Sequence, residues 1–112
     1  TAHNKDGLQQ IMPLISNYTQ GKVRIVLGVV DDKDLDGILP LFPPTAQYYF
    51  CKADIPRGLH ADTLQRKANE HHLQGAVYSS VKEALDNAIK EASSNDLIFV
   101  GGSTFTVAEI ID

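Results

Sequence analysis

The sequence predicts an α/β fold: a three-layer sandwich in which a mostly parallel sheet is covered by helices on both faces. Short runs of β-branched and aromatic residues alternate with segments whose apolar residues recur at helical spacing. These runs are almost continuously apolar, as expected for strands that are buried on both faces. The alternation occurs four times along the chain, which is typical of parallel strands connected by helices.

Four segments are predicted strands because apolar, β-branched and aromatic residues are concentrated over a few positions. The clearest is the last, Leu-Ile-Phe-Val. The four segments are residues 23–27, 46–50, 76–78 and 97–100.

Helical periodicity precedes the first strand and separates the strands from one another. Pro13 and Pro40 lie inside the first and second of these segments, and a proline inside a helix favours a kink or a break. Gly75 is predicted to end the third helix, and Ser80 and Glu83 have the spacing of a capping box before the fourth. The predicted helices are residues 8–18, 35–42, 62–72 and 81–92.

Composition and charge restrict the class of protein. At 112 residues, with 43% hydrophobic and 21% charged residues, the chain can fold around one core without a disulfide or a metal. No apolar run reaches the roughly 20 residues that span a membrane, and a net charge of −4 argues against nucleic acid as a partner. The single cysteine, Cys51, suits a reducing compartment, so a cytoplasmic protein is expected. We also expect a monomer.

The loops that follow the four predicted strands are the candidate binding region. Right-handed crossovers place all of these loops at one edge of a parallel sheet, and ligands bind at the carboxyl ends of its strands. Three of the ten basic residues fall in these loops: Lys33, Lys52 and Arg57. Cations gathered at this edge of an acidic domain predict a site for a carboxylate. The loops are residues 29–34, 51–57, 79–80 and 101–104.

Two of these loops also allow a purely structural interpretation. The stretch Gly-Gly-Ser-Thr at 101–104 either lets the backbone approach an anion, or makes a tight turn in which Ser103 or Thr104 caps a final helix. The acidic stretch at 31–34 is either a polar helix start or part of a site. Neither matches a phosphate-binding glycine motif, so the triphosphate of any ATP is expected to bind elsewhere. The histidines and the cysteine lack zinc-binding spacing, and no metal site is predicted.

Four motifs in the same order resemble the C-terminal domain of the Mur ligase superfamily. The string Ala-His-Asn-Lys-Asp-Gly at residues 2–7 is similar to the D-x-A-H-N-P-x-G motif that opens this domain, with Lys5 in place of proline. Residues 27–37 resemble the G-x-x-x-D-K-D segment of the folylpolyglutamate synthase/dihydrofolate synthase branch, and residues 49–59 resemble its strand and x-P-R-x-L turn. The resemblance is completed by residues 80–85 and 96–105, although many relatives have Gly-Ser-Leu-Tyr in the last segment.

This resemblance implies a Rossmann-like three-layer fold and an ATP-dependent acid–amino-acid ligase with two main domains. In such a ligase, ATP and Mg²⁺ bind mainly to the N-terminal domain, where a substrate carboxylate becomes an acyl phosphate. The amine of the incoming amino acid then attacks this acyl phosphate. The C-terminal domain closes over the nucleotide and helps to bind the amino acid. For the folate branch, the amino acid is L-glutamate and the acceptor is folate or dihydropteroate.

The resemblance also implies roles for individual residues. His3 and Asn4 would contact the nucleotide at the domain interface. Lys33 and Ser103 would contact the incoming amino acid, with help from Arg57. No catalytic residue is assigned to this domain, so the isolated chain is expected to be inactive. We interpret residues 1–112 as a single C-terminal domain excised from a larger enzyme. Two alternatives remain: a Mur-type peptidoglycan ligase domain and a non-catalytic α/β binding module.

Overall fold

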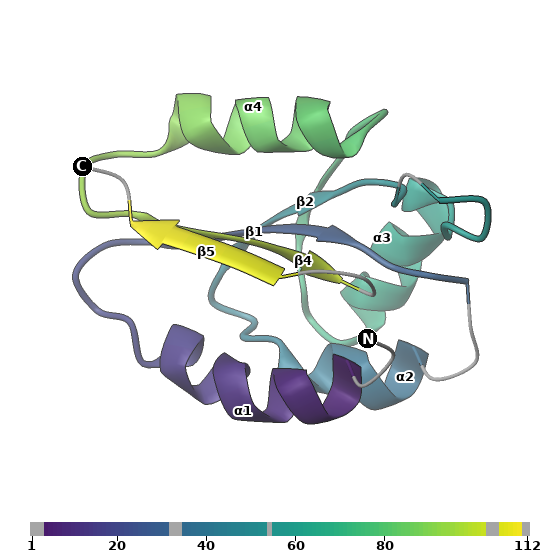
Figure 1. Ribbon diagram of the computed structural model, residues 1–112, viewed down its shortest axis with the longest axis horizontal. Coiled ribbons are helices and arrows are strands. Elements are labelled where there is room, and N and C mark those ends of the chain that lie inside the picture. Colours follow the sequence, from purple (N-terminus) through teal and green to yellow (C-terminus); the bar gives the residue numbers. More distant parts are fainter. Residues whose placement is uncertain (1–3, 32–34, 54, 103–105, 111–112) are drawn as a thin grey trace.

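A five-stranded sheet forms the centre of the protein (Figure 1). The computed structural model describes residues 4–31, 35–53, 55–102 and 106–110. The strand order is β3-β2-β1-β4-β5; the first four strands in the chain are parallel, and β5 runs antiparallel to β4. The predicted α/β fold with a mostly parallel sheet is confirmed. The strands are β1 (Val23–Gly28), β2 (Gln47–Phe50), β3 (Gly75–Val77), β4 (Leu97–Gly102) and β5 (Thr106–Ile110).

Helices cover both faces of this sheet (Figure 1). On one face lies α4 (Val81–Glu91), and on the other lie α1 (Asn4–Ser16), α2 (Leu35–Ile38) and α3 (Ala61–Glu70). Successive strand residues point to opposite faces. In β1, Ile25 and Leu27 pack into the core beneath α1, whereas Val26 packs into the core beneath α4. Burial on both faces explains why the strands are almost continuously apolar.

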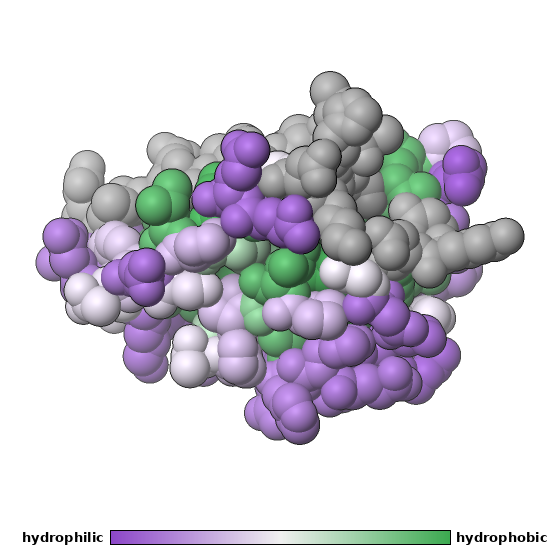
Figure 2. Space-filling model, turned by 90° about the horizontal axis from the view of Figure 1, so that it is seen from below, coloured by the Kyte–Doolittle hydropathy of each residue, from purple (hydrophilic) through white to green (hydrophobic). Residues whose placement is uncertain are grey.

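The outer surface of the α1–α3 layer is mixed in character. Figure 2 shows hydrophobic residues that reach the surface among larger areas of hydrophilic residues. The side chain of Leu14, on α1, is 72% exposed, and Ile89, on α4, is 50% exposed. The two residues lie on opposite faces of the sheet, so they do not form one hydrophobic patch. Single exposed apolar residues are common on soluble domains and mark no docking surface by themselves.

The local signals at the helices are mostly confirmed. The helix α1 continues through Pro13 as one element of 13 residues. Pro40, in contrast, lies in a 3₁₀ turn, η1 (Leu39–Leu41), which replaces the second half of the predicted helix. At the start of α4, the Glu83 N–H donates to the Ser80 hydroxyl oxygen at 3.0 Å. The Glu83 carboxylate reaches back to the Ser79 N–H at 2.8 Å, one residue earlier than in a standard capping box.

Two expectations were wrong. In the described part of the chain after β4 there is a strand and not a helix: residues 106–110 form β5, in which Val107 pairs with Val100 of β4. This segment, Thr-Val-Ala-Glu-Ile, is rich in β-branched residues, and the exposed edge of β4 offers it a partner. Gly75 does not end the third helix but begins β3, where a Cβ would collide with the backbone of Tyr48. The turn after α3 instead uses His72, which has a φ of 67°.

Candidate functional site

The four parallel strands end at one common edge of the sheet, as predicted. Gly28 at the end of β1 pairs with Gly102 of β4, and Phe50 at the end of β2 pairs with Val77 of β3. The pair Leu27 and Phe50 connects β1 to β2 at the same level, so it links the β1–β4 pair to the β2–β3 pair. The loops after these strands therefore leave from the same edge, which is the ligand-binding edge in open α/β sheets.

Two of these loops are bonded to each other through their backbones. The Asp31 N–H donates to the Arg57 carbonyl oxygen at 2.7 Å, and the Leu59 N–H donates to the Val29 carbonyl oxygen at 2.9 Å. Between them, Val30 and Gly58 form an antiparallel bridge. We call this pairing of residues 29–31 with residues 57–59 the loop ribbon. It brings the loop after β1 and the loop after β2 into one unit.

The loop ribbon carries one of the predicted binding residues, Arg57. Its side chain is exposed, and its guanidinium Nη2 donates to the Asp31 carbonyl oxygen over a long 3.4 Å. Lys52, on the same loop, is also exposed. Within the described residues, neither Arg57 nor Lys52 makes a salt bridge. Because both side chains are exposed, an anionic ligand can reach these cations at this edge.

The structure does not describe the side chains of the other predicted site residues. His3, Lys33 and Ser103 lie outside the described residues. Asn4 is the first residue of α1, and its side chain lies outside the description as well. Their assigned roles stay predictions.

Cys51, directly after β2, is not a reactive thiol at this edge. It is fully buried, and its S–H donates to the Leu27 carbonyl oxygen at 3.5 Å. Burial raises the pKa of the Cys51 thiol to about 11, so the thiol stays protonated near neutral pH. Its role is packing, in agreement with the sequence-based interpretation of a small apolar residue at a strand end.

A buried charged network lies at the opposite, amino edge of the sheet, and the sequence analysis missed it. Arg24 Nε donates to Asp96 Oδ2 at 3.0 Å, and Arg24 Nη1 donates to the Tyr49 hydroxyl at 2.9 Å. The Tyr49 hydroxyl donates in turn to Glu91 Oε1, at the end of α4, at 2.6 Å. A lone arginine inside the apolar run of β1 was the signal, because a buried cation requires a buried partner.

The electrostatics of this network follow from burial and pairing. Burial and the hydrogen bond to Glu91 raise the pKa of Tyr49 to about 12, although Arg24 opposes this rise. Burial by itself would raise the pKa of Asp96, but the N–H groups of Ser93 and Lys22 and the guanidinium of Arg24 together lower it. The network connects β1, β2, α4 and the residue just before β4, and it is structural because it lies away from the ligand-binding edge.

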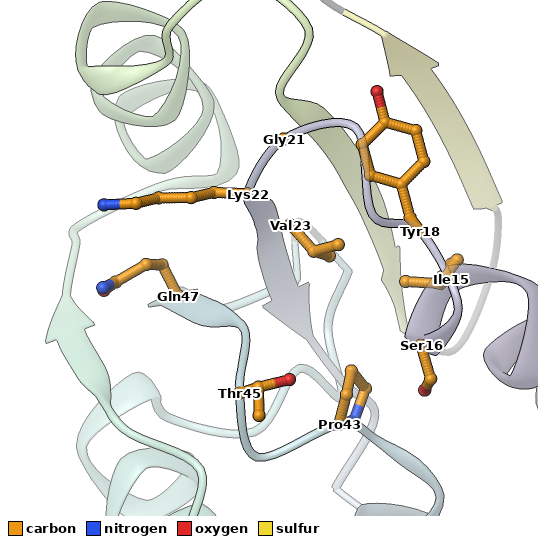
Figure 3. A pocket seen from close by; sticks show the side chains of 9 residues that line it. All are labelled: Ile15, Ser16, Tyr18, Gly21, Lys22, Val23, Pro43, Thr45 and Gln47. Atoms are coloured by element: carbon orange, nitrogen blue, oxygen red, sulfur yellow. The ribbon is translucent and has the colours of Figure 1, made fainter.

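A depression of about 250 Å³ also lies at the amino edge. The end of α1, the turn before β1 and the segment before β2 contribute its walls (Figure 3). The Lys22 and Gln47 side chains extend in the same direction, away from Ser16 and Tyr18 on the other side (Figure 3). The hydroxyl of Tyr18 is already engaged, since it donates to the Asn95 carbonyl oxygen. Because it lies at the amino edge, this depression is separate from the predicted carboxylate site at the carboxyl edge. Its lining residues are Ile15, Ser16, Tyr18, Gly21, Lys22, Val23, Pro43, Thr45 and Gln47.

Across the described ranges, no group of three or more His, Cys, Asp or Glu side chains is placed to hold a metal ion. In the same part of the chain, no helix combines the length and the hydropathy needed to cross a membrane.

Comparison with known proteins decides the family. The family model described as "Mur ligase, glutamate ligase domain" matches residues 1–104. The chain belongs to the Mur ligase family. This Mur ligase domain is 33% identical, over 93 residues, to the dihydrofolate synthase/folylpolyglutamate synthase of Escherichia coli K12; the match covers 82% of the chain and 21% of that protein. The predicted resemblance to the C-terminal domain of this branch is confirmed.

Solved structures agree in fold. The Mur ligase domain matches Escherichia coli FolC in complex with ADP at a TM-score of 0.77 and 28% identity, over 92% of this chain and 25% of that one. It also matches a bifunctional folylpolyglutamate synthase/dihydrofolate synthase with Mn, AMPPNP and L-glutamate bound, at a TM-score of 0.69 and 25% identity, over 88% and 23% of the two chains. The chain thus spans about a quarter or less of the proteins that it matches.

Proposed function

We propose that this chain is the C-terminal domain of a larger ATP-dependent ligase that adds L-glutamate to folate or dihydropteroate. One observation carries the proposal: over 88% of its length, the chain is similar to a bifunctional folylpolyglutamate synthase/dihydrofolate synthase whose structure holds L-glutamate. The two exposed cations at the carboxyl edge, Lys52 and Arg57, support it, because glutamate brings carboxylates that need such partners. Lys33 and Ser103 are proposed to bind the same amino acid.

The proposed reaction forms an amide bond. ATP phosphorylates the carboxylate of the acceptor, the glutamate amine attacks the carbonyl carbon of the resulting acyl phosphate, and phosphate leaves as the amine loses a proton. An acyl phosphate must be protected from water until the amine arrives, so closure of this domain over the nucleotide would protect the intermediate. His3 and Asn4 are proposed to meet the nucleotide at the interface between the domains.

Among the residues that the structure describes, no group of side chains fits a site for a metal ion. The sequence has no P-loop lysine motif. We therefore assign ATP and Mg²⁺ mainly to the N-terminal domain, in cis, and no reaction step to a metal ligand of this chain. The enzyme is proposed to be a cytoplasmic monomer without nucleic-acid or membrane partners.

The test is phosphate release that depends on L-glutamate. The full-length protein should release phosphate only when ATP, L-glutamate and dihydropteroate or a folate are all present, whereas the isolated chain should release none. Turnover by the isolated chain would contradict the assignment. Turnover by the full-length protein with a UDP-muramoyl acceptor, and none with dihydropteroate or folate, would instead assign the domain to a peptidoglycan ligase.

A further inference from the structure

The loop ribbon lies directly beyond the ends of β1 and β2. The Cys51 N–H donates to the Leu27 carbonyl oxygen at 3.0 Å, directly after the last residue of β2. The next backbone bonds between the same two chain segments are those of the loop ribbon, at 2.7 and 2.9 Å. Inside the sheet the two segments run parallel, whereas in the loop ribbon they run antiparallel, because the chain turns back after β2.

Apolar side chains hold the loop ribbon against the core. Val29 is 1% exposed and belongs to the core beneath α1, and Leu59, which is partly buried, packs against the same core. Each strand of the loop ribbon thus has one anchoring side chain. The polar members, Asp31 and Arg57, remain on the outside. This arrangement fixes the backbone while it leaves a charged surface.

A tight turn at Gly58 makes this pairing possible. The Ile55 N–H donates to the Ala53 carbonyl oxygen at 2.8 Å, and the Gly58 N–H donates to the Ile55 carbonyl oxygen at 3.0 Å. The chain folds back so closely that a Cβ at Gly58 would lie under 3.0 Å from the Ala53 carbonyl oxygen and 3.1 Å from Cγ of Lys52. Any side chain at this position would have to displace backbone, and the turn would open.

We propose that Gly58 and the loop ribbon are the positioning device of the amino-acid site. They hold Arg57 and Lys52 in fixed places at the carboxyl edge. Gly58 touches no ligand in this scheme and acts through these cations. The inference rests on the proposed function, because the ligand is the glutamate of that reaction. Preorganisation of this kind matters because an error of about 1 Å in placement can cost about 100-fold in rate.

The test compares two alanine variants of the full-length ligase. In Gly58→Ala the new Cβ meets the Ala53 carbonyl oxygen, and in Gly21→Ala it meets the Asn95 carbonyl oxygen at the opposite edge of the sheet, again under 3.0 Å. For Gly58→Ala, kcat/KM for L-glutamate should fall roughly 10- to 100-fold while KM for ATP stays within about twofold. For Gly21→Ala, the melting temperature should fall without a selective change in the glutamate KM. If both variants lose stability and both keep the glutamate KM, the positioning role is wrong.

A second readout does not depend on activity. Amide hydrogen exchange should show protected N–H groups at Asp31 and Leu59 in the wild type, and selective loss of protection at these two in Gly58→Ala. An active wild type without this protection would contradict the loop ribbon itself. A full-length protein that ignores L-glutamate would contradict the proposed function, and the positioning role would be rejected with it. If Gly58→Ala does not fold, Asp31→Pro replaces it, because proline has no N–H and so removes the donor of the 2.7 Å bond at an exposed residue.

Discussion

Replacing Asp96 by alanine should destabilise the fold more than any change on the outer face of a helix. Asp96 is 3% exposed and accepts three hydrogen bonds: from Arg24 Nε at 3.0 Å, from the Lys22 N–H at 2.9 Å and from the Ser93 N–H at 2.9 Å. The variant would leave the guanidinium of Arg24, whose side chain is 9% exposed, without its buried carboxylate. The loss therefore combines a missing ion pair with two backbone donors that have no partner.

The expected magnitude follows from these contacts. Removing one partner of a buried ion pair costs about 3–5 kcal/mol when the remaining charge stays buried without compensation, and here Glu91 Oε1 remains 3.8 Å from Arg24 Nη1. For a domain of this size, that corresponds to a fall in melting temperature of roughly 12–20 °C. The Tyr49 hydroxyl, 2.9 Å from Arg24 Nη1, still accepts from the guanidinium, which places the expected value toward the lower end.

Thermal and urea unfolding of the isolated chain, followed by circular dichroism, would measure this loss. The matched control is Asp86→Ala, which removes an exposed carboxylate that pairs with Lys82 at 2.8 Å within α4. An exposed pair of this kind contributes only about 0–1 kcal/mol. Similar unfolding free energies for the two variants would refute the reasoning that burial makes the Asp96 pair strong.

The same pair predicts a dependence on pH. Because the folded-state pKa of Asp96 is lowered, its contribution is fully present above the unfolded value of about 4 and is lost as the pH falls through the folded value. The difference in stability between the wild type and Asp96→Ala should therefore be largest near neutral pH and shrink in acid. A difference that stays constant down to about pH 2 would show that the carboxylate charge is not the cause.

Three further changes test other parts of the molecule. Lys33→Ala in the full-length ligase should weaken the binding of L-glutamate by about 1–3 kcal/mol, with little effect on the binding of ATP or on the melting temperature. An unchanged glutamate KM together with a large loss of melting temperature would show that Lys33 is structural. Ser103→Ala should lower kcat/KM for glutamate, with little loss of stability because residues 106–110 form a strand and not the helix that a cap would stabilise; early melting with normal glutamate binding would remove it from the site. Gly7→Ala should stabilise the isolated chain by about 0.4–1 kcal/mol, because a Cβ there meets nothing within 4 Å inside α1; a lower melting temperature would contradict this.

Local pattern was sufficient for much of the fold and for the family. The apolar runs predicted four strands, and the Ser80 and Glu83 spacing predicted the start of α4, because each depends on residues a few positions apart. The ordered motifs indicated the Mur ligase family, which the match over residues 1–104 confirms. The edge of the sheet where ligands would bind also followed from the sequence, since parallel strands with right-handed crossovers have their carboxyl ends together.

The tertiary structure decided what depends on partners far away in the chain. Whether residues 106–110 form a helix or a strand depended on the free edge of β4, and the need for glycine at position 75 depended on the backbone of Tyr48. The loop ribbon joins residues about 30 positions apart, so no local pattern could predict that Arg57 belongs to the same unit as Asp31. The sequence shows Arg24 as a charge inside a predicted strand, but it does not show that Asp96 is its partner. Which carboxylate pairs with a buried arginine depends on how the strands and α4 pack together.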